Sequence, residues 1–343
     1  MKNSKKIAKI VTICSAAALA LSACGDGAAG AGDNGELTLK YAFNAPASTF
    51  PAVQMQEWAD QMEERTDGLV EVETYPGATL LDTGDIYPGV SSGIVEVGLD
   101  APSYDPSQFP VSSAAALPLG YDNAEDASAA FLDLLLEQEP EEFDDYQIVT
   151  AFTAEPAYIQ TATPVRSLDD LKGMTLRSPG GTHNDTVEAL GAVPVGMAPP
   201  EIAENLGTGV LDGIVGSREQ LKDFEFAEFL PYLTEVPLGP SASFVAVMDQ
   251  EAFDNLDAEI QDEILNLREE MSVFASQYQD SHAEESLDWA KENYDLEVIE
   301  LDDDEAAEWQ EILDGNVDQW IDRYQDADFD PQAMVDHLLE STS

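Results

Sequence analysis

Apolar and polar residues alternate along the chain in two distinct periods, which predict strands interleaved with helices. Residues 37–43 alternate with the two-residue period of a strand. Pro51 then opens a helix with Met55, Trp58, Ala59 and Met62 on one face, and Asp67-Gly68 ends it. Residues 70–74 again alternate, which predicts a half-buried strand.

The same rhythm continues through the rest of the chain. Further strands are predicted at 95–100, 147–152, 158–162, 174–178, 193–197, 211–215, 244–248 and 297–301, and further helices at 83–91, 124–138, 182–190, 200–206 and 305–324. Regular alternation of strands and helices indicates an α/β fold with mainly parallel pairing. The strand at 244–248 is expected to cross back into the first of two lobes, the one that contains the N-terminal strands.

One predicted helix is much longer than the others. From Asp257 to Tyr294 the chain contains no glycine or proline, and its apolar residues recur at alternating steps of four and three. A coiled-coil seam is one explanation, but the spacing persists for only a few turns. A helix that lies across two lobes explains the length better.

The composition adds a strongly acidic charge to this picture. The 343 residues include 69 Asp and Glu against 14 Lys and Arg, a formal net charge of −55. Nucleic acids and anionic lipid surfaces are therefore disfavoured partners, because both need a basic face. The acids are scattered among apolar periodic segments, which indicates a folded protein whose surface is adapted to a saline or alkaline medium. At molar salt the Debye length is only ~3 Å, so such a surface barely repels an anionic ligand.

The N-terminus has the features of a secretory signal. Four lysines within the first nine residues precede an apolar run from Ile10 to Ala20, which is too short for a mature membrane helix. Leu21-Ser22-Ala23-Cys24 then resembles the lipobox of bacterial lipoproteins, which implies cleavage after residues 1–23 and a lipid on Cys24. The alternative is an ordinary signal peptide in which Cys24 is incidental. Residues 24–35 predict a flexible, lipidated tether.

Cleavage at this point has two consequences. Cys14 lies in the removed segment, so the mature chain has no internal disulfide and its stability must come from burial. Losing the four lysines leaves 69 acids against 10 bases, a net charge of −59. No later apolar run approaches the roughly 20 residues of a membrane span.

Three motifs in the middle of the chain carry a family resemblance. Residues 167–179 have the sequence SLDDLKGMTLRSP, residues 189–195 the sequence ALGAVPV, and residues 204–213 the sequence ENLGTGVLDG. In this order and spacing they resemble the solute-binding subunits of TRAP transporters. The earlier Arg65-Thr66-Asp67-Gly68, with its strand and Pro76-Gly77, is similar to the opening of that family. The resemblance covers nearly the whole mature chain.

The resemblance implies an α/β, two-lobed, periplasmic-binding-protein-like fold with a ligand cleft and a long helix crossing both lobes. The first lobe is then expected to comprise residues 36–153 and about 241–275, and the second residues 154–240 and about 276–340. Such lobes close around a small organic acid, usually a carboxylate, and dock on a TRAP membrane permease. We expect an extracytoplasmic receptor, held at the membrane by the lipid on Cys24, without catalytic activity, metal or cofactor.

Arg177 is the strongest candidate for a ligand contact. It lies mid-strand among apolar neighbours, just before Pro179-Gly180-Gly181 and a helix that begins near Thr182. A planar guanidinium can hold a carboxylate through two parallel charge-assisted hydrogen bonds. The glycine pair and the helix N-terminus can offer backbone N–H groups to the same anion. The alternative is a structural arginine paired with one of the many acids.

Further candidates in the second lobe come from the resemblance. Tyr158 lies on the strand where some family members place a second arginine, and the absence of that arginine here argues against a ligand clamped at two carboxylates. Tyr158 suits the core as well as the ligand. Ser217 and Arg218 follow Asp212-Gly213, where the family often places a polar ligand contact.

The first lobe supplies candidates at its predicted strand ends. Residues at the ends of strands in open α/β sheets line such crevices. Asn44 and Phe50 follow the first strand, and Tyr104 follows the strand that ends at Asp100. The tyrosines suggest a ligand with some apolar or aromatic body.

Enzymatic interpretations find less support in the sequence. The histidines His183, His282 and His337 are far apart and have no Cys or carboxylate at a metal-binding spacing. Two rivals to the TRAP receptor remain. One is a binding lipoprotein of another transporter type, and the other is a secreted hydrolase that acts on an acid or ester with a carboxylate pair in the cleft. Turnover would favour the hydrolase, and ligand-induced closure without turnover favours the receptor.

Overall fold

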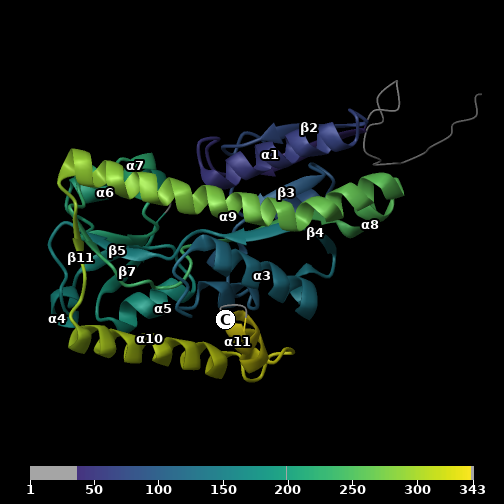
Figure 1. Cartoon of the computed structure of the whole chain (residues 1–343). Helices are drawn as coiled ribbons and strands as arrows, with labels where there is room; N and C mark the ends of the chain where they lie inside the picture. The colour runs from purple at the N-terminus through teal and green to yellow at the C-terminus, as the bar shows by residue number, and fades with distance from the viewer. Residues whose placement is uncertain (1–36, 198, 341–343) are drawn as a thin grey trace, which may run out of the picture.

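The computed structural model describes residues 37–197 and 199–340, and within them the chain forms two sheets with helices packed around them (Figure 1). The predicted signal peptide, Cys24 and the tether lie outside these described residues. No helix in the described part of the chain has the length and apolar character needed to cross a membrane.

The first sheet has the strand order β2-β1-β3-β10-β4. Its strands are β1 (Leu37–Phe43), β2 (Val70–Tyr75), β3 (Val97–Asp100), β4 (Tyr146–Thr153) and β10 (Ser243–Asp249). Strand β1 pairs in parallel with β2 and β3, whereas β10 is antiparallel to both β3 and β4. The strand predicted at 244–248 is therefore confirmed, and it does return to the first sheet.

The second sheet has the order β11-β9-β5-β8-β6-β7. Its strands are β5 (Tyr158–Thr161), β6 (Thr175–Ser178), β7 (Val193–Gly196), β8 (Gly213–Gly216), β9 (Tyr232–Thr234) and β11 (Glu297–Ile299). Strand β6 is parallel to β7 and β8, but β5 is antiparallel to β8 and β9. The expectation of mainly parallel pairing is therefore wrong around β5 and β10. Both strands adjoin segments that cross between the sheets, and they run against their neighbours.

The helices that the sequence predicted lie close to their expected positions. They are α1 (Phe50–Arg65), α2 (Ile86–Ser91), α3 (Ala124–Gln138), α4 (Leu168–Leu171), α5 (Thr182–Ala189), α6 (Pro199–Gly207), α7 (Gln220–Asp223), α8 (Gln250–Asp254), α9 (Ala258–Tyr294), α10 (Asp303–Arg323) and α11 (Pro331–Glu340). Helix α3 has the bounds that the sequence predicts. Its start is fixed by the side chain of Asn123, which accepts a hydrogen bond from the Asp126 N–H at 2.8 Å. Helices α4, α7, α8 and α11 and the short strand β9 were not predicted.

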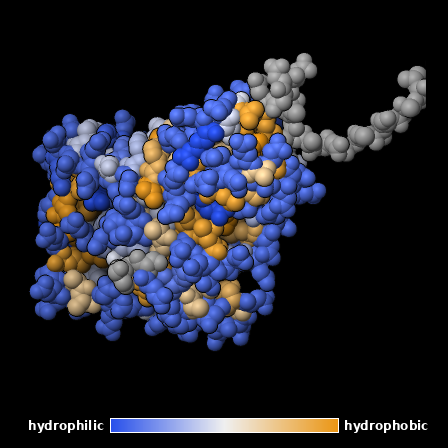
Figure 2. All heavy atoms as spheres, turned by 45° about the vertical axis from the view of Figure 1, so that its right-hand side comes forward, coloured by the Kyte–Doolittle hydropathy of each residue, from blue (hydrophilic) through white to orange (hydrophobic). Residues whose placement is uncertain are grey.

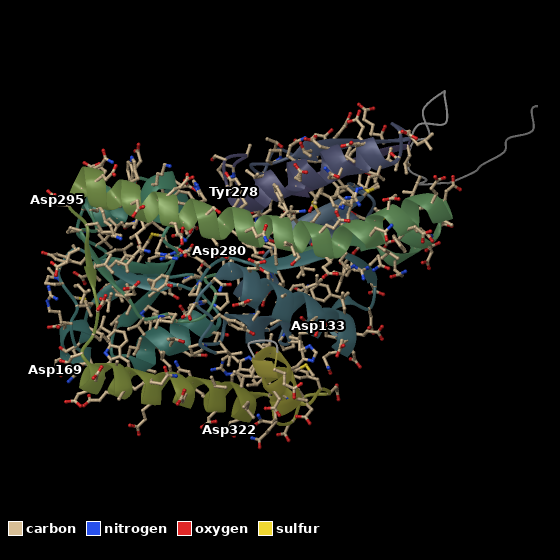
Figure 3. All side chains as sticks on the ribbon, viewed as in Figure 1. Asp133, Asp169, Tyr278, Asp280, Asp295 and Asp322 are labelled. Carbon is tan, nitrogen blue, oxygen red and sulfur yellow. The ribbon has the colours of Figure 1, made fainter. Side chains whose placement is uncertain are left out.

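Helix α9 spans both sheets, as its length predicted (Figure 1). Its first half buries Ile264, Leu267 and Met271 in the core beside the first sheet. Its second half buries Leu287 and Ala290 in a separate core against the second sheet. Midway along the helix, the Asp280 carboxylate accepts hydrogen bonds from the first two backbone N–H groups of α3, at 2.8 and 3.1 Å (Figure 3). A carboxylate at a helix N-terminus is electrostatically favoured, so this contact ties α9 to the first lobe.

Two short segments connect the sheets, and we call them the crossing segments (154–157 and 239–242). They lie side by side, because the Ala154 N–H donates to the Ala242 carbonyl at 2.9 Å and the Ala157 N–H to the Gly239 carbonyl at 2.8 Å. Gly239 has a φ of +87°, and a Cβ there would lie 2.5 Å from the Leu117 carbonyl oxygen. Only glycine fits this position, which fixes where the chain re-enters the first lobe.

The division of the chain into lobes stays a prediction, but the packing of the C-terminus differs from it. Helix α10 buries Trp309 and Leu313 against the second sheet. Further on, Trp320 packs with α11 on residues of α3, in the first lobe. The indole N–H of Trp320 donates to Ser113 Oγ at 2.9 Å. The C-terminal residues therefore pack against the first lobe and connect it to the second. The sequence predicted that they would belong to the second lobe.

The surface carries the acidic character that the composition predicts. Figure 2 shows a face dominated by hydrophilic residues and interrupted by small hydrophobic groups. Exposed acids such as Asp169, Asp295 and Asp322 point away from the body of the molecule (Figure 3). Like charges at this density repel one another in the compact state.

We therefore expect the thermal unfolding midpoint to rise by several degrees as NaCl increases from tens of millimolar to molar concentration, because salt screens this repulsion. Calorimetry at several salt concentrations measures the effect, with a near-neutral homologue as the control. A flat or falling midpoint would show that the acidic surface is not a saline adaptation of this kind.

Candidate functional site

A cavity of about 840 Å³ lies between the two lobes. Its walls come from residues that follow β1 and β3 on one side and β6, β7 and β8 on the other. The carboxyl ends of parallel strands meet at one edge of each sheet, which is where ligands bind in open α/β folds. Aromatic side chains make up much of the lining: Phe43, Phe50, Tyr87, Phe109, Phe224 and Phe244. The cavity has the size and mixed character of a small-molecule site.

Arg177, on β6, is the cationic side chain among the described residues that line this cavity. Its Nε donates to the Met197 carbonyl at 3.1 Å and its NH1 to the Val215 carbonyl at 3.5 Å. The residue is only 4% exposed, and burial lowers the pKa of its guanidinium. Among the described residues no carboxylate lies within ion-pair distance of it. The two carbonyls and a hydrogen bond with the Tyr104 hydroxyl hold the guanidinium, and its remaining N–H groups can face an anion in the cavity.

Three predicted contacts of the first lobe line the opposite wall. Asn44 Nδ2 donates to Thr83 Oγ1 at 3.2 Å. Phe50 packs edge-on against Phe244, with ring centroids 5.5 Å apart, and both rings line the cavity. Tyr104 is 45% exposed and also lines it. The structure therefore brings Asn44, Phe50, Tyr104 and Arg177 around one cavity, while their contact with a ligand stays a prediction.

The other three predicted contacts, Tyr158, Ser217 and Arg218, do not line the cavity. Arg218 forms an ion pair with Glu155 of a crossing segment, with NH2 2.5 Å from Oε2, and its guanidinium lies 5.1 Å from the centre of the Tyr158 ring. Ser217 donates to Glu219 Oε1 at 2.6 Å. The Arg218 guanidinium is therefore engaged with Glu155 of a crossing segment, and the Ser217 hydroxyl with Glu219.

The Glu155–Arg218 pair is deeply buried. The Glu155 side chain is 0% exposed and that of Arg218 is 16% exposed. Glu155 also accepts a hydrogen bond from the Arg218 backbone N–H at 2.5 Å and from Nε at 2.9 Å. Burial raises the pKa of Glu155, and the hydrogen bonds from Arg218 oppose that rise. Burial lowers the pKa of Arg218, but the hydrogen bonds and charge of Glu155 outweigh it and raise that pKa overall.

Sequence reasoning missed several polar groups of the cavity. Glu219 and Gln220 follow β8 and line it, and Asp100 lines it from the end of β3. Burial raises the pKa of Glu219 to about 7, helped by the charge of Glu155. Burial likewise raises the pKa of Asp100 to about 6, against a hydrogen bond from the Ala101 N–H. The strand-end rule points to these positions, but a sequence does not show which way side chains face in the turn after β8.

Within the part of the chain that the structure describes, one cluster of potential metal ligands forms away from the cavity. Asp133 and Glu137 of α3 and His337 of α11 have ligand atoms within 4.8 Å of one another. Asp133 also lies 3.1 Å from His337 Nε2. The sequence spacing did not predict this cluster, because helix α11, which supplies His337, was not predicted. Both carboxylates are exposed, and such groups commonly occur without an ion.

Comparisons with known proteins find relatives that bind small solutes, as a cavity of this kind suggests. The family model for bacterial extracellular solute-binding proteins, family 7 (DctP), matches residues 42–323. The C4-dicarboxylate-binding periplasmic protein DctP of Rhodobacter capsulatus is 23% identical over 312 residues, which cover 84% of this chain and 87% of that protein.

Two solved structures are similar over most of the chain. A TRAP periplasmic solute-binding protein of Desulfovibrio salexigens matches with a TM-score of 0.83 and 35% identity, covering 89% of this chain and 95% of that one. A marine metagenome TRAP solute-binding protein specific for aromatic acid ligands, solved with 3-hydroxybenzoate, matches with a TM-score of 0.82 and 25% identity, covering 89% of this chain and 98% of that one.

Proposed function

Because this chain belongs to the DctP family of bacterial extracellular solute-binding proteins, we propose that it is a TRAP solute-binding receptor whose organic-acid ligand is held by Arg177 in the cavity between the lobes. The receptor collects the acid outside the membrane and delivers it to the permease subunits. Hinge closure at the crossing segments brings the two lobes together over the ligand.

One observation carries the assignment of Arg177. The chain has 69 acidic side chains, yet among the described residues none is paired with this buried arginine in the cavity. A buried charge without a partner costs several kcal/mol, so a structural arginine would be expected to have one. A ligand carboxylate supplies that partner, in the bidentate geometry that guanidinium groups favour.

The proposal is tested by a thermal-shift screen of organic acids in high salt, on the chain from Gly25 onward. We expect a subset of carboxylic acids to raise the unfolding midpoint, and the methyl esters of the same acids to have no effect, because an ester does not pair with Arg177. If no acid raises the midpoint, or if the esters act equally, the carboxylate receptor is contradicted.

The relatives are binding receptors, and we extend their lack of catalysis to this chain. The hydrolase alternative finds no support in the family or in the two structures described above. A receptor of another transporter type is disfavoured because both of those structures are TRAP proteins.

We also propose that the lipid on Cys24 holds the receptor at the outer face of the cell membrane, on the strength of Leu21-Ser22-Ala23-Cys24. Cys24→Ser is expected to block processing or to release the protein from the membrane fraction, because the acceptor sulfur is lost. Detergent partitioning and the mass of the mature N-terminus measure this. A native protein that is soluble and unmodified would contradict the anchor.

A further inference from the structure

Three phenylalanine rings of the first lobe form one aromatic group in the cavity wall, which we call the phenylalanine cluster (Phe43, Phe50 and Phe244). Phe43 ends β1, Phe50 begins α1 and Phe244 lies on β10. The Phe244 ring meets the other two edge-on, with ring centroids 6.1 Å from Phe43 and 5.5 Å from Phe50. All three belong to one hydrophobic core, yet they stay 2%, 6% and 8% exposed. The core is therefore open to the cavity through aromatic rings.

Further rings line the cavity from other directions. Tyr87 and Phe109 belong to a separate core of the first lobe and pack edge-on, with ring centroids 5.4 Å apart. Phe224, which follows α7 in the second lobe, is only half-buried. Rings from both lobes thus surround the same space. An aromatic ligand gains there from leaving water and from edge-to-face contacts that a saturated ring does not make.

The segment that follows β3 contacts both the phenylalanine cluster's strand and Arg177, the proposed carboxylate clamp. The hydroxyl of Tyr104 is hydrogen-bonded with the Arg177 guanidinium. The preceding residue, Ser103, accepts a hydrogen bond through Oγ from the Ser243 N–H at 3.1 Å, and Phe244 follows Ser243 on β10. Because Arg177 and Phe244 line one cavity on either side of this short segment, a single small molecule can contact both.

The charges of the lining allow for one carboxylate. Among the described residues that line the cavity, Arg177 is the one cationic side chain. The acidic residues of the lining are Asp100, Asp105, Glu201, Glu219 and Asp223. A second carboxylate on the ligand would lose water without gaining a cationic partner, which is costly for a charged group.

A cationic group on the ligand is not required by these acids. Asp105 and Glu201 are exposed to water. Glu219, which is buried, accepts hydrogen bonds from Ser217 Oγ at 2.6 Å and from Gln279 Nε2 at 3.0 Å. The protein and the solvent therefore already supply partners for these three carboxyl groups, and the rings are left as the main surface for the rest of the ligand.

We propose that the ligand is an aromatic monocarboxylate, with its carboxylate on Arg177 and its ring against the phenylalanine cluster. This inference rests on the proposed function, because it assumes that Arg177 holds an organic acid. It names the class of acid that the cavity selects, and it excludes dicarboxylates.

Matched acids test the inference by titration calorimetry on the purified protein in high salt. Each pair has the same carbon frame with an aromatic or a saturated ring: benzoate and cyclohexanecarboxylate, phenylacetate and cyclohexylacetate, 3-phenylpropanoate and 3-cyclohexylpropanoate. Acetate lacks a ring, and succinate and glutarate represent the dicarboxylates. The tightest ligand is expected among the aromatic acids. It should bind about two- to tenfold more tightly than its saturated partner and roughly 10- to 100-fold more tightly than acetate.

The outcomes separate this inference from the proposed function. If the saturated acids or the dicarboxylates bind as tightly as the aromatic acids, the aromatic class is wrong while the carboxylate receptor stands. If no acid of any kind binds, the receptor assignment itself fails.

Variants assign the selectivity to the rings. Phe244→Leu keeps an apolar side chain but removes the ring, so the affinity ratio within the best aromatic and saturated pair is expected to fall toward one. Phe50→Leu should act in the same direction and serves if Phe244→Leu does not fold. Phe253→Leu is the matched control and keeps the ratio, because Phe253 lies in the same core but not in the cavity lining. Folded Phe244→Leu or Phe50→Leu proteins with the full parental ratio overturn the proposal.

Discussion

Arg177→Met is expected to abolish measurable binding of the organic acid while the protein stays folded. The substitution leaves the ligand carboxylate without its cation in a buried cavity. Removing one partner of a buried, hydrogen-bonded charge pair costs about 2–5 kcal/mol, much of it from the charge that is left unpaired. At ~1.4 kcal/mol per tenfold change, the affinity should fall roughly 30- to 4,000-fold.

Titration calorimetry with the best acid of the screen measures this loss, and circular dichroism shows whether the variant folds. Arg177→Lys retains the charge but loses the planar fork, so it should also bind poorly. Arg166→Met is the matched control, since Arg166 lies on the surface with 55% of its side chain exposed and pairs with Glu297. A folded Arg177→Met protein that binds within a factor of a few of the parent would contradict the clamp.

Of the substitutions considered, Arg218→Met should lower the free energy of unfolding the most. The substitution leaves the fully buried carboxylate of Glu155, on a crossing segment, without its cationic partner and close to the charge of Glu219. Breaking a buried ion pair by removing one partner costs about 3–5 kcal/mol. Exposed pairs are worth about 0–1 kcal/mol, so Arg166→Met, which breaks the surface pair with Glu297, should cost far less.

The stability loss in Arg218→Met should also depend on pH. Burial raises the pKa of Glu155, and the variant removes the hydrogen bonds that oppose this rise. A carboxyl whose folded pKa lies above its unfolded value stabilises the fold when protonated, and that contribution is lost as the pH rises through the folded pKa. Urea unfolding should therefore show a larger loss near about pH 8 than near about pH 5. A variant within about 1 kcal/mol of the parent at both pH values would show that the pair does not hold the crossing segments.

The sequence predicted the elements with strong periodicity and missed those set by tertiary contacts. Strand β1 and helix α3 have their predicted bounds, because period and capping residues are local signals. Strand β9 has three residues and is ordered by pairing with β5 and β11. The return of α10 and α11 to the first lobe depends on Trp320 packing against residues about 200 positions earlier, such as its hydrogen-bond partner Ser113.

The candidate site was likewise predictable where local patterns determine it, and not where tertiary contacts do. The strand-end rule and the family motif located Arg177, Asn44, Phe50 and Tyr104 at one cavity. Arg218 was expected beside them, but it pairs with Glu155, 63 residues away in the sequence. With 69 acids available, a sequence alone does not show which one an arginine selects.

The central claim, a receptor that binds an organic acid without converting it, is tested most directly by titrating the native protein with the strongest acid of the screen and then recovering that acid. Calorimetry gives the stoichiometry, and nuclear magnetic resonance of the same sample shows the chemical state of the ligand. We predict saturable binding of one acid per chain and full recovery of the unchanged molecule. Absence of saturable binding, or conversion of the acid into a product, would contradict the account.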